Sequence, residues 1–428
     1  MASGAPQGET KTQGKKPLDA KSLKIEIERQ LLRPLEDVSV INLVNLFVEY
    51  AYISRASDIH IEPGANKLRV RFRIDGVLRD IFEHIAISKE LQPEIISRIK
   101  VLAGLRTDEH NTPQDGRFKA RIENLGAIDV RVSIVPTFYG ENAVMRILAE
   151  TQIFSLEDLG FSGDDLEKVK RAIKRPHGMI LANGPTGSGK TTTLYTILKE
   201  LNTPEVSIIT IEDPVEYSIE GTSQIQTNAR VGLTFASGLR SILRQDPNII
   251  MVGEIRDQET ANIAVNAALT GHLLLSTLHT NDAATTFPRL VDMGVPPFLV
   301  ASTVNIIMGQ RLVRVLCDNC KVEKKLSKEE ITSLAEIAPY VKDLRTTKFY
   351  APGGCEKCGG VGYQGRTAIR EVLEVDDKIR NLVMRRANAA QIKEAAIKNG
   401  MKTMMQDGIE KAAKGITSLA EVLRTITE

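Results

Sequence analysis

Eight residues, Gly184 to Thr191, constrain the fold of this chain more than any other stretch. They read Gly-Pro-Thr-Gly-Ser-Gly-Lys-Thr and fit the pattern G-x-x-x-x-G-K-[ST]. Glycines in this pattern let the backbone curve into a nest of N–H groups around phosphate oxygens. The apolar residues 177–183 indicate a buried strand before the loop, and residues 192–198 indicate a helix after it. A strand, a phosphate loop and a helix in this order predict an α/β domain.

The loop predicts a site for ATP and Mg²⁺. We expect Lys190 to reach the β- and γ-phosphates and the Thr191 hydroxyl to ligate Mg²⁺. The complete set of expected nucleotide-binding residues is Gly184, Pro185, Thr186, Gly187, Ser188, Gly189, Lys190, Thr191 and Thr192.

Composition narrows the class of protein. The 428 residues suggest two to four domains. A net charge of +2, 4% aromatic residues and no Trp disfavour a protein that stacks single-stranded nucleic acid, so we expect no nucleic-acid partner. The sequence has no apolar run of eighteen residues and no secretory leader, which predicts a cytoplasmic location.

The N-terminal part reads as a tail and a small α+β domain. Residues 1–22 are polar and predict a disordered tail, and residues 23–150 predict the domain. Helical spacing covers 40–56. Two hairpins follow, one with strands at 68–74 and 77–82 joined by Asp75-Gly76, the other with strands at 117–122 and 128–134 joined at 124–126.

Arg69, Arg71 and Arg73 alternate along the first hairpin and therefore share one face of the sheet. Two interpretations stay open. The arginines form an ordinary solvated face, or they deliver positive charge to a phosphate on a neighbouring subunit.

After a linker at 151–159, a second domain is expected at 160–312. Apolar strands alternate with helices there, which predicts a mostly parallel sheet with helices on both faces. Polar residues follow the strands expected at 178–183, 206–211, 248–252 and 272–275. Because ligands of open parallel sheets bind at the carboxyl ends of the strands, these polar residues should meet at one site.

Two glutamates are candidates for the chemistry. Glu212 follows the second strand and Glu254 follows the third, where Gly253 replaces the aspartate usual in a Walker B strand. We favour Glu212 as the carboxylate that activates water and Glu254 as the carboxylate on the Mg²⁺ side, with the reverse assignment left open. His272 and His279 are seven residues apart, which would place them on opposite faces of a strand. His279, at the strand end, is the better candidate sensor of the γ-phosphate.

Two CxxC pairs predict a structural zinc site. The ligands would be Cys317, Cys320, Cys355 and Cys358. We expect this module at 313–370, with a helical lobe around 328–341. Helical spacing at 389–398, 403–414 and 418–426 predicts a C-terminal helical subdomain at 371–428.

These motifs together resemble those of the type II secretion and type IV pilus assembly ATPases (GspE/PulE/PilB-like). The resemblance covers about residues 40–425. It is carried by the segments 57–63, 73–76, 184–191, 211–216, 243–247, 253–257, 270–272, 278–283 and 310–312, followed by the four cysteines.

The resemblance implies a RecA-like motor domain preceded by a PAS-like domain, assembled as a cytoplasmic hexamer at the inner face of the plasma membrane. Arg117, Arg131 and Arg146 become candidates to reach the phosphates, in cis or in trans. Its expected partner is an inner-membrane platform protein (PilC/GspF-like). The Cys₄ module favours pilus extension or secretion over retraction, and the absence of a further N-terminal docking domain favours direct contact with the platform protein.

Two alternatives have other functions. A nucleic-acid translocase of similar core would need a basic channel or aromatic platforms. A nucleotide-binding scaffold would bind ATP without turnover, which the Gly253 replacement keeps open.

Overall fold

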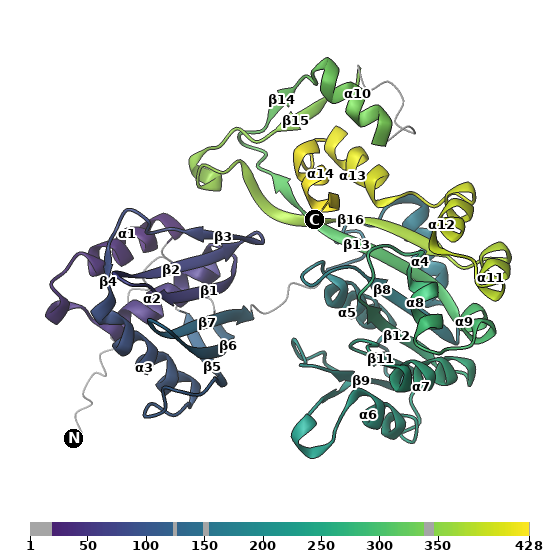
Figure 1. Ribbon diagram of the computed structural model, residues 1–428, viewed down its shortest axis with the longest axis horizontal. Helices are drawn as coiled ribbons and strands as arrows, with labels where there is room; N and C mark the ends of the chain where they lie inside the picture. Colours follow the sequence, from purple (N-terminus) through teal and green to yellow (C-terminus); the bar gives the residue numbers. More distant parts are fainter. Residues whose placement is uncertain (1–18, 123–125, 149–153, 338–345, 428) are drawn as a thin grey trace, which may run out of the picture. The chain divides into compact units, whose positions relative to one another are not determined.

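The computed structural model describes residues 19–122, 126–148, 154–337 and 346–427. The chain divides into two compact units, Met1–Thr151 and Gln152–Glu428 (Figure 1). This division falls at the start of the linker expected from the sequence.

The first unit is an antiparallel sheet with helices. The strand order is β3-β2-β1-β7-β6-β5, and β4 also pairs with β2. The strands are β1 (Ala56–Pro63), β2 (Lys67–Ile74), β3 (Val77–Asp80), β4 (Ile87–Ser88), β5 (Gln114–Ile122), β6 (Gly126–Thr137) and β7 (Gly140–Leu148). The helices are α1 (Ala20–Leu31), η1 (Leu35–Asp37), α2 (Val40–Ile53), η2 (Lys89–Leu91) and α3 (Gln92–Ala103).

The first predicted hairpin is confirmed. β2 and β3 pair antiparallel, and the two residues between them, Asp75 and Gly76, have φ of 50° and 82°. Positive φ at both positions is the geometry that a two-residue turn needs to match the twist of its strands. Alternate residues of β2 are buried, and Phe72 packs edge-on against Tyr50 of α2 with ring centroids 5.0 Å apart. The second hairpin, β5 and β6, is also present, but most of its expected turn lies outside the described residues.

The last three residues of the predicted tail, 20–22, belong to a helix, and residues 1–18 lie outside the described part of the chain. Helix α1 begins at Ala20, and the Asp19 side chain caps it by accepting a hydrogen bond from the Ser22 backbone N–H at 2.7 Å. Leu23 and Ile27 are fully buried one helical turn apart. The Asp19 cap satisfies a backbone N–H of the first turn, which explains why the helix begins three residues before Leu23.

The second unit contains a seven-stranded sheet in the order β10-β9-β11-β12-β8-β13-β16. Every pair is parallel except β13 with β16. The strands are β8 (Gly178–Asn183), β9 (Ile208–Glu212), β10 (Ser223–Gln226), β11 (Ile249–Val252), β12 (Leu273–Leu278), β13 (Val304–Leu316) and β16 (Tyr363–Glu374). β8, β9, β11 and β12 are buried along their whole length, as expected of parallel strands covered on both faces.

Helices cover this sheet and follow its strands (Figure 1). They are α4 (Gly163–Ile173), α5 (Lys190–Leu201), η3 (Ala229–Val231), α6 (Phe235–Ile242), α7 (Gln258–Leu269), α8 (Thr286–Asp292) and α9 (Pro297–Thr303). The predicted α/β alternation is therefore confirmed.

The cysteine-bearing segment leaves the sheet at the end of β13 and returns at the start of β16. It contains β14 (Val322–Lys324), α10 (Lys328–Ile337), β15 (Phe349–Ala351) and η4 (Glu356–Cys358). Both ends of the expected module, 313–316 and 363–370, thus belong to strands of the large sheet. The expected helical lobe is present as α10, and its last residues lie outside the described part of the chain.

The three C-terminal helices predicted from the sequence are confirmed within one residue at each end, and a further helix precedes them. The four are α11 (Asp377–Met384), α12 (Ala389–Lys398), α13 (Met404–Ala413) and α14 (Leu419–Thr427). Across the described residues, no helix is both long enough and apolar enough to cross a membrane.

Candidate functional site

The phosphate loop lies where the sequence places it. Buried strand β8 ends at Asn183, the loop follows at once, and α5 begins at Lys190. Gly184 has a φ of +137°, and a Cβ there would lie 2.3 Å from the Gln310 carbonyl oxygen of β13. Only glycine fits at this position, because both the φ angle and the neighbouring strand exclude a side chain.

The Lys190 ammonium group points into the loop. Its Nζ donates hydrogen bonds to the carbonyl oxygens of Gly184 at 2.8 Å and Pro185 at 2.9 Å. Burial lowers the pKa of Lys190, and the nearby Glu254 carboxylate opposes part of this shift. A cation held inside a ring of glycines at a helix N-terminus is suited to bind a phosphate.

The strand register brings the acidic and histidine candidates to the same edge as the loop. Leu278 of β12 pairs with Asn183, and Val252 of β11 pairs with both Ser276 of β12 and Ile211 of β9. Glu212, Glu254 and His279 therefore lie at or just beyond the carboxyl ends of adjacent parallel strands, beside the phosphate loop. This convergence was expected from the sequence.

Glu212 is buried and held by hydrogen bonds. Its carboxylate accepts from the Tyr195 hydroxyl, from Thr210 Oγ1 at 2.5 Å and from Gln224 Nε2 at 3.2 Å. Burial, followed by the charge of Glu212, raises the pKa of Tyr195, so this hydroxyl remains a donor to the carboxylate. The donors fix the orientation of Glu212, and none of them was predicted from the sequence.

Glu254 is the carboxylate whose charge raises the pKa of Lys190 against the effect of burial. It also forms an ion pair with Arg256 and a hydrogen bond with His279, whose Nε2 lies 3.1 Å from Glu254 Oε2. A Cβ at Gly253 would lie 3.3 Å from the Glu212 Cα. Glycine at this position therefore reflects the close approach of the ends of β9 and β11.

His272 does not lie with this group. It precedes the first residue of β12, at the opposite end of the strand from His279, and its Nδ1 is 3.0 Å from the Ala267 carbonyl at the end of α7. The two histidines therefore flank opposite ends of β12. The prediction that they lie on opposite faces of a strand was wrong.

Gln310, which belongs to one of the segments that carry the family resemblance but had no predicted role, supports the phosphate loop from β13. Gln310 of β13 is 1% exposed, and its Nε2 donates to the Ser188 carbonyl at 2.8 Å. Its Oε1 accepts from the Thr193 hydroxyl of α5 at 3.0 Å. The sequence signal that could have identified this role is a glutamine within an otherwise apolar strand.

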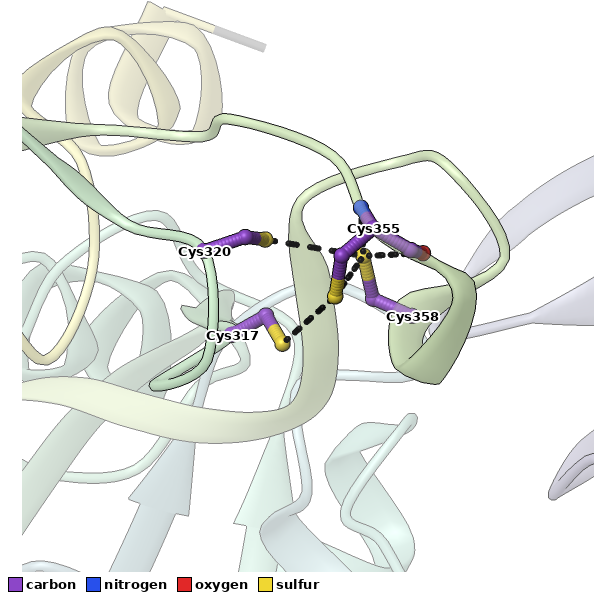
Figure 2. Close-up of side chains that lie close together, drawn as sticks. All are labelled: Cys317, Cys320, Cys355 and Cys358. Atoms are coloured by element: carbon purple, nitrogen blue, oxygen red, sulfur yellow. Dashed lines mark hydrogen bonds between the residues drawn. The ribbon is translucent and has the colours of Figure 1, made fainter.

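The four cysteines form one cluster (Figure 2). All four Sγ atoms lie within 4.8 Å of one another, with separations of 3.8 Å for Cys317 and Cys355 and 3.7 Å for Cys320 and Cys358. A tetrahedral zinc ion with metal–sulfur bonds of about 2.3 Å holds its sulfurs about 3.8 Å apart. The Gly362 backbone N–H also donates to Cys358 Sγ at 3.1 Å, which favours a thiolate. The donor set and its spacing fit Zn²⁺.

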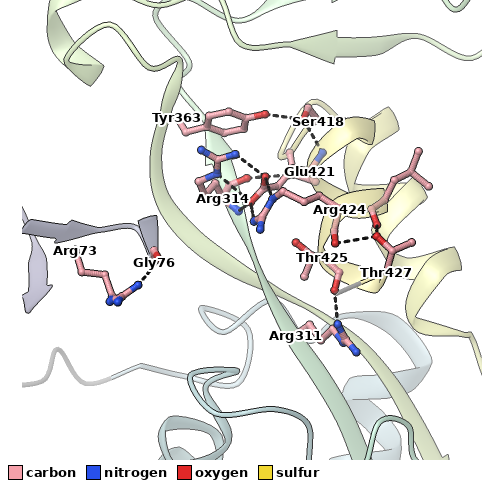
Figure 3. Close-up of polar contacts among 12 residues, drawn as sticks. Arg73, Gly76, Arg311, Arg314, Tyr363, Ser418, Glu421, Arg424, Thr425 and Thr427 are labelled. Atoms are coloured by element: carbon pink, nitrogen blue, oxygen red, sulfur yellow. Dashed lines mark hydrogen bonds and ion pairs between the residues drawn. The ribbon is translucent and has the colours of Figure 1, made fainter. Parts of the chain in front are cut away.

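Strand β13 also holds the last helix of the chain (Figure 3). Arg314 donates to Glu421 of α14 through Nε at 2.9 Å and Nη2 at 2.6 Å, and Arg424 donates to the same carboxylate at 2.8 Å. Glu421 is 2% exposed, and these arginines lower its pKa to about 2 against the opposing effect of burial. The Tyr363 and Ser418 hydroxyl oxygens, 2.7 Å apart, and a bond from Arg311 to the Thr425 carbonyl complete the contact.

The first unit contains a row of charged residues that runs across five strands. In β-sheet register, Arg117 pairs with Arg131, Arg131 with Arg146, Arg146 with Asp58, and Asp58 with Arg73. Directly paired residues point to the same face of a sheet, so all five share one face. We call these five residues the arginine row.

Asp58 is the acidic member of the arginine row. It is 5% exposed, its Oδ1 accepts from Arg146 Nε at 2.9 Å, and its Oδ2 lies 3.5 Å from Arg73 Nε. The other arginines of β2 are paired elsewhere. Arg71 donates to Glu62 at 2.9 Å through Nε, and Arg69 lies 3.7 Å from Asp80. Of the three arginines of β2, Arg73 alone shares a carboxylate with one of the candidates named from family resemblance, Arg146.

Comparisons with known proteins agree with this geometry. Residues 34–424 match the model of a family described as type II/IV secretion system protein. The chain is 47% identical over 407 residues to the type IV pilus assembly ATPase PilB of Thermus thermophilus, covering 94% of this chain and 45% of that protein. It is 49% identical over 407 residues to the type II secretion system protein E of Xanthomonas campestris, covering 93% of this chain and 69% of that protein.

A solved structure agrees on the fold. The Legionella pneumophila ATPase DotB superposes with a TM-score of 0.68 at 22% identity, covering 92% of this chain and 97% of that one.

Proposed function

The chain belongs to the type II/IV secretion system protein family and is an ATP-hydrolysing P-loop enzyme, and we propose that it is the motor that powers assembly of a type IV pilus or a type II secretion pseudopilus. The observation that carries this proposal is the meeting of Lys190, Glu254 and His279 beside the phosphate loop. Phosphoryl transfer needs positioning and charge stabilisation more than covalent chemistry, and these residues supply both.

Thr191 and Glu254 would hold Mg²⁺, which neutralises charge that develops on the phosphates. This assignment is supported by the charge of the Glu254 carboxylate near Lys190, whereas the Glu212 carboxylate is already held by three donors. Glu212 would orient and activate the attacking water. His279, fixed by Glu254, would sense the γ-phosphate.

We assign the parts of the chain as follows. Residues 20–148 would form the PAS-like domain, and residues 160–316 together with β16 (Tyr363–Glu374) would form the RecA-like domain. Residues 317–362 would form the zinc module, and residues 375–427 a C-terminal helical subdomain. Arg117, Arg131 and Arg146 would supply positive charge to the phosphates, in cis or in trans.

The motor would be a cytoplasmic hexamer recruited to the inner face of the plasma membrane. An inner-membrane platform protein of the PilC/GspF type would receive its domain motions and add pilin or pseudopilin subunits. A ligand drives such motions only if its affinity differs between states of the ring.

The test is steady-state Mg-ATP hydrolysis over a range of protein concentrations, with Lys190→Ala and Glu212→Gln measured alongside. Turnover per subunit should rise as the protein assembles and be lost in both variants. Tight nucleotide binding without turnover at any concentration would instead identify a scaffold. Salt-sensitive binding of DNA would identify a nucleic-acid translocase.

A further inference from the structure

The loop 280–286, which follows His279, is held by polar side chains that the nucleotide chemistry does not use. Asn183, the last residue of β8, donates through Nδ2 to Thr280 Oγ1 at 2.8 Å, to Thr286 Oγ1 at 2.9 Å and to the Asp282 carbonyl. Asn183 is fully buried and precedes the phosphate loop directly. The loop after His279 is therefore attached to the strand that carries the phosphate loop.

A second buried side chain holds the same loop from β16. Glu371 Oε1 accepts a hydrogen bond from the Ala283 backbone N–H at 2.6 Å, and Oε2 accepts one from the Met404 N–H at 3.4 Å. Met404 is the first residue of α13. Burial raises the pKa of Glu371, which is 2% exposed. This carboxyl group joins the loop to the start of a C-terminal helix.

The register of three strands explains how both side chains reach the loop. Asn183 pairs with Gly309 of β13, and Gly309 pairs with Glu371. A Cβ at Gly309 would lie 2.9 Å from Asn183 Oδ1 and 3.0 Å from Glu371 Cγ. Because Gly309 has no side chain, the neighbouring Asn183 and Glu371 can both reach the loop.

A third contact reaches the loop from outside the sheet. Lys393 of α12 forms an ion pair with Asp282, with Nζ 3.0 Å from Oδ2. Two C-terminal helices, α12 and α13, are thus connected to the segment that begins one residue after His279.

We propose that Asn183, Glu371 and Lys393 are positioning residues that set the place of His279 relative to Glu254, so that a shift of α12 or α13 changes the rate of hydrolysis. The proposal rests on the proposed function in that His279 acts on the γ-phosphate. Displacement of a catalytic group by about 1 Å can cost about a hundredfold in rate, so a small movement of this loop suffices.

The first test does not depend on turnover. Amide hydrogen exchange is measured in the segment 280–286 for the full chain, for Lys393→Met and for Lys398→Met. Lys393→Met should speed exchange there by about tenfold, because it releases one of the loop's attachments. Lys398 lies on the same helix and pairs with Glu394, so its variant is the matched control and should leave exchange unchanged. Equal exchange in all three proteins would overturn the proposal, whether or not the protein hydrolyses ATP.

The second test places the residues in the reaction. Asn183→Ala should lower kcat by about tenfold and Lys393→Met by about threefold, with the affinity for a fluorescent ADP analogue changed less than about twofold. In a His279→Ala background, both substitutions should lower kcat by less than about twofold, because residues that act through His279 have nothing left to position. Full additivity in that background, or loss of affinity equal to the loss of kcat, would overturn the positioning role. If loop exchange responds as expected while the unsubstituted protein has no turnover, the proposed function fails and the structural link stands.

Discussion

The phosphate-loop site and the arginine row gather charged residues in opposite ways. At the phosphate loop, parallel strands end at one edge of a sheet, and each strand delivers the residue that follows it. In the arginine row, antiparallel strands run side by side, and each delivers a residue from its middle. The first arrangement needs only that neighbouring parallel strands end close to the same level, whereas a shift of one residue in any strand pair would break the row.

The largest expected effect tests the phosphate-loop site. Lys190→Ala should lower kcat for Mg-ATP by about a thousandfold, because it removes the buried cation that faces the phosphates. Its melting temperature should not fall, since burial already disfavours the charge of this lysine. Activity and thermal melts check both points, with Lys199→Ala on the same helix as control. If Lys190→Ala retained turnover, catalysis would not be centred on this edge.

The next effect concerns the ion pairs that join α14 to β13 in the second unit and their response to acid. Glu421→Gln should destabilise the second unit by about 2 kcal/mol at neutral pH, because Arg314 and Arg424 lose their shared carboxylate. The folded pKa of Glu421, about 2, lies below its ordinary value of 4.5, so this stabilisation is present above pH 4.5 and is lost as the pH falls toward 2. Urea unfolding at several pH values checks this. A difference between wild type and variant that stays constant from pH 7 to pH 3 would contradict it.

A smaller effect tests whether the arginine row takes part in hydrolysis. Arg131→Ala and Arg146→Ala should each lower kcat by about tenfold, as expected for loss of one charge that faces a phosphate. The matched control is Arg71→Ala, an arginine of β2 that is paired with Glu62 and should have no effect on kcat. If all three variants behave alike, the arginine row is an ordinary solvated face and the comparison with the phosphate-loop site fails.

The smallest effect concerns Asp58. Asp58→Asn should destabilise the first unit by about 1 kcal/mol, because Arg146 and Arg73 lose a shared, nearly buried counter-ion. Hydrogen exchange in β1 and β7 would report the loss locally. An unchanged exchange rate would show that the arginine row does not depend on its acidic member.

The sequence predicted the features that depend on neighbouring residues. The turn at Asp75-Gly76, the phosphate loop and the strand ends at Glu212 and Glu254 all follow from a few consecutive residues. The arginine row could not be predicted in the same way. It depends on the register of four separate strand pairs, and a bulge between Ala56 and Asp58 ends the regular register of β1 with β2 directly beside Asp58.

The prediction for His272 was wrong for a related reason. Counting along a strand assigns faces, but it cannot show that the strand begins one residue later, at Leu273. The link from Asn183 through Gly309 to Glu371 was equally hidden, since these residues lie far apart in sequence and meet only through β13.

The cysteine module is connected to the sheet like an insertion, because its two ends lie next to each other. Leu316 and Tyr363 are paired neighbours at the ends of β13 and β16, so residues 317–362 leave and re-enter the sheet at adjacent points. Such segments are usually gained and lost freely. Here Phe349 shares a hydrophobic core with Ile409 and Val422 of the C-terminal helices. A lineage that discarded the module would expose this apolar surface, so its loss would require compensating substitutions in α13 and α14.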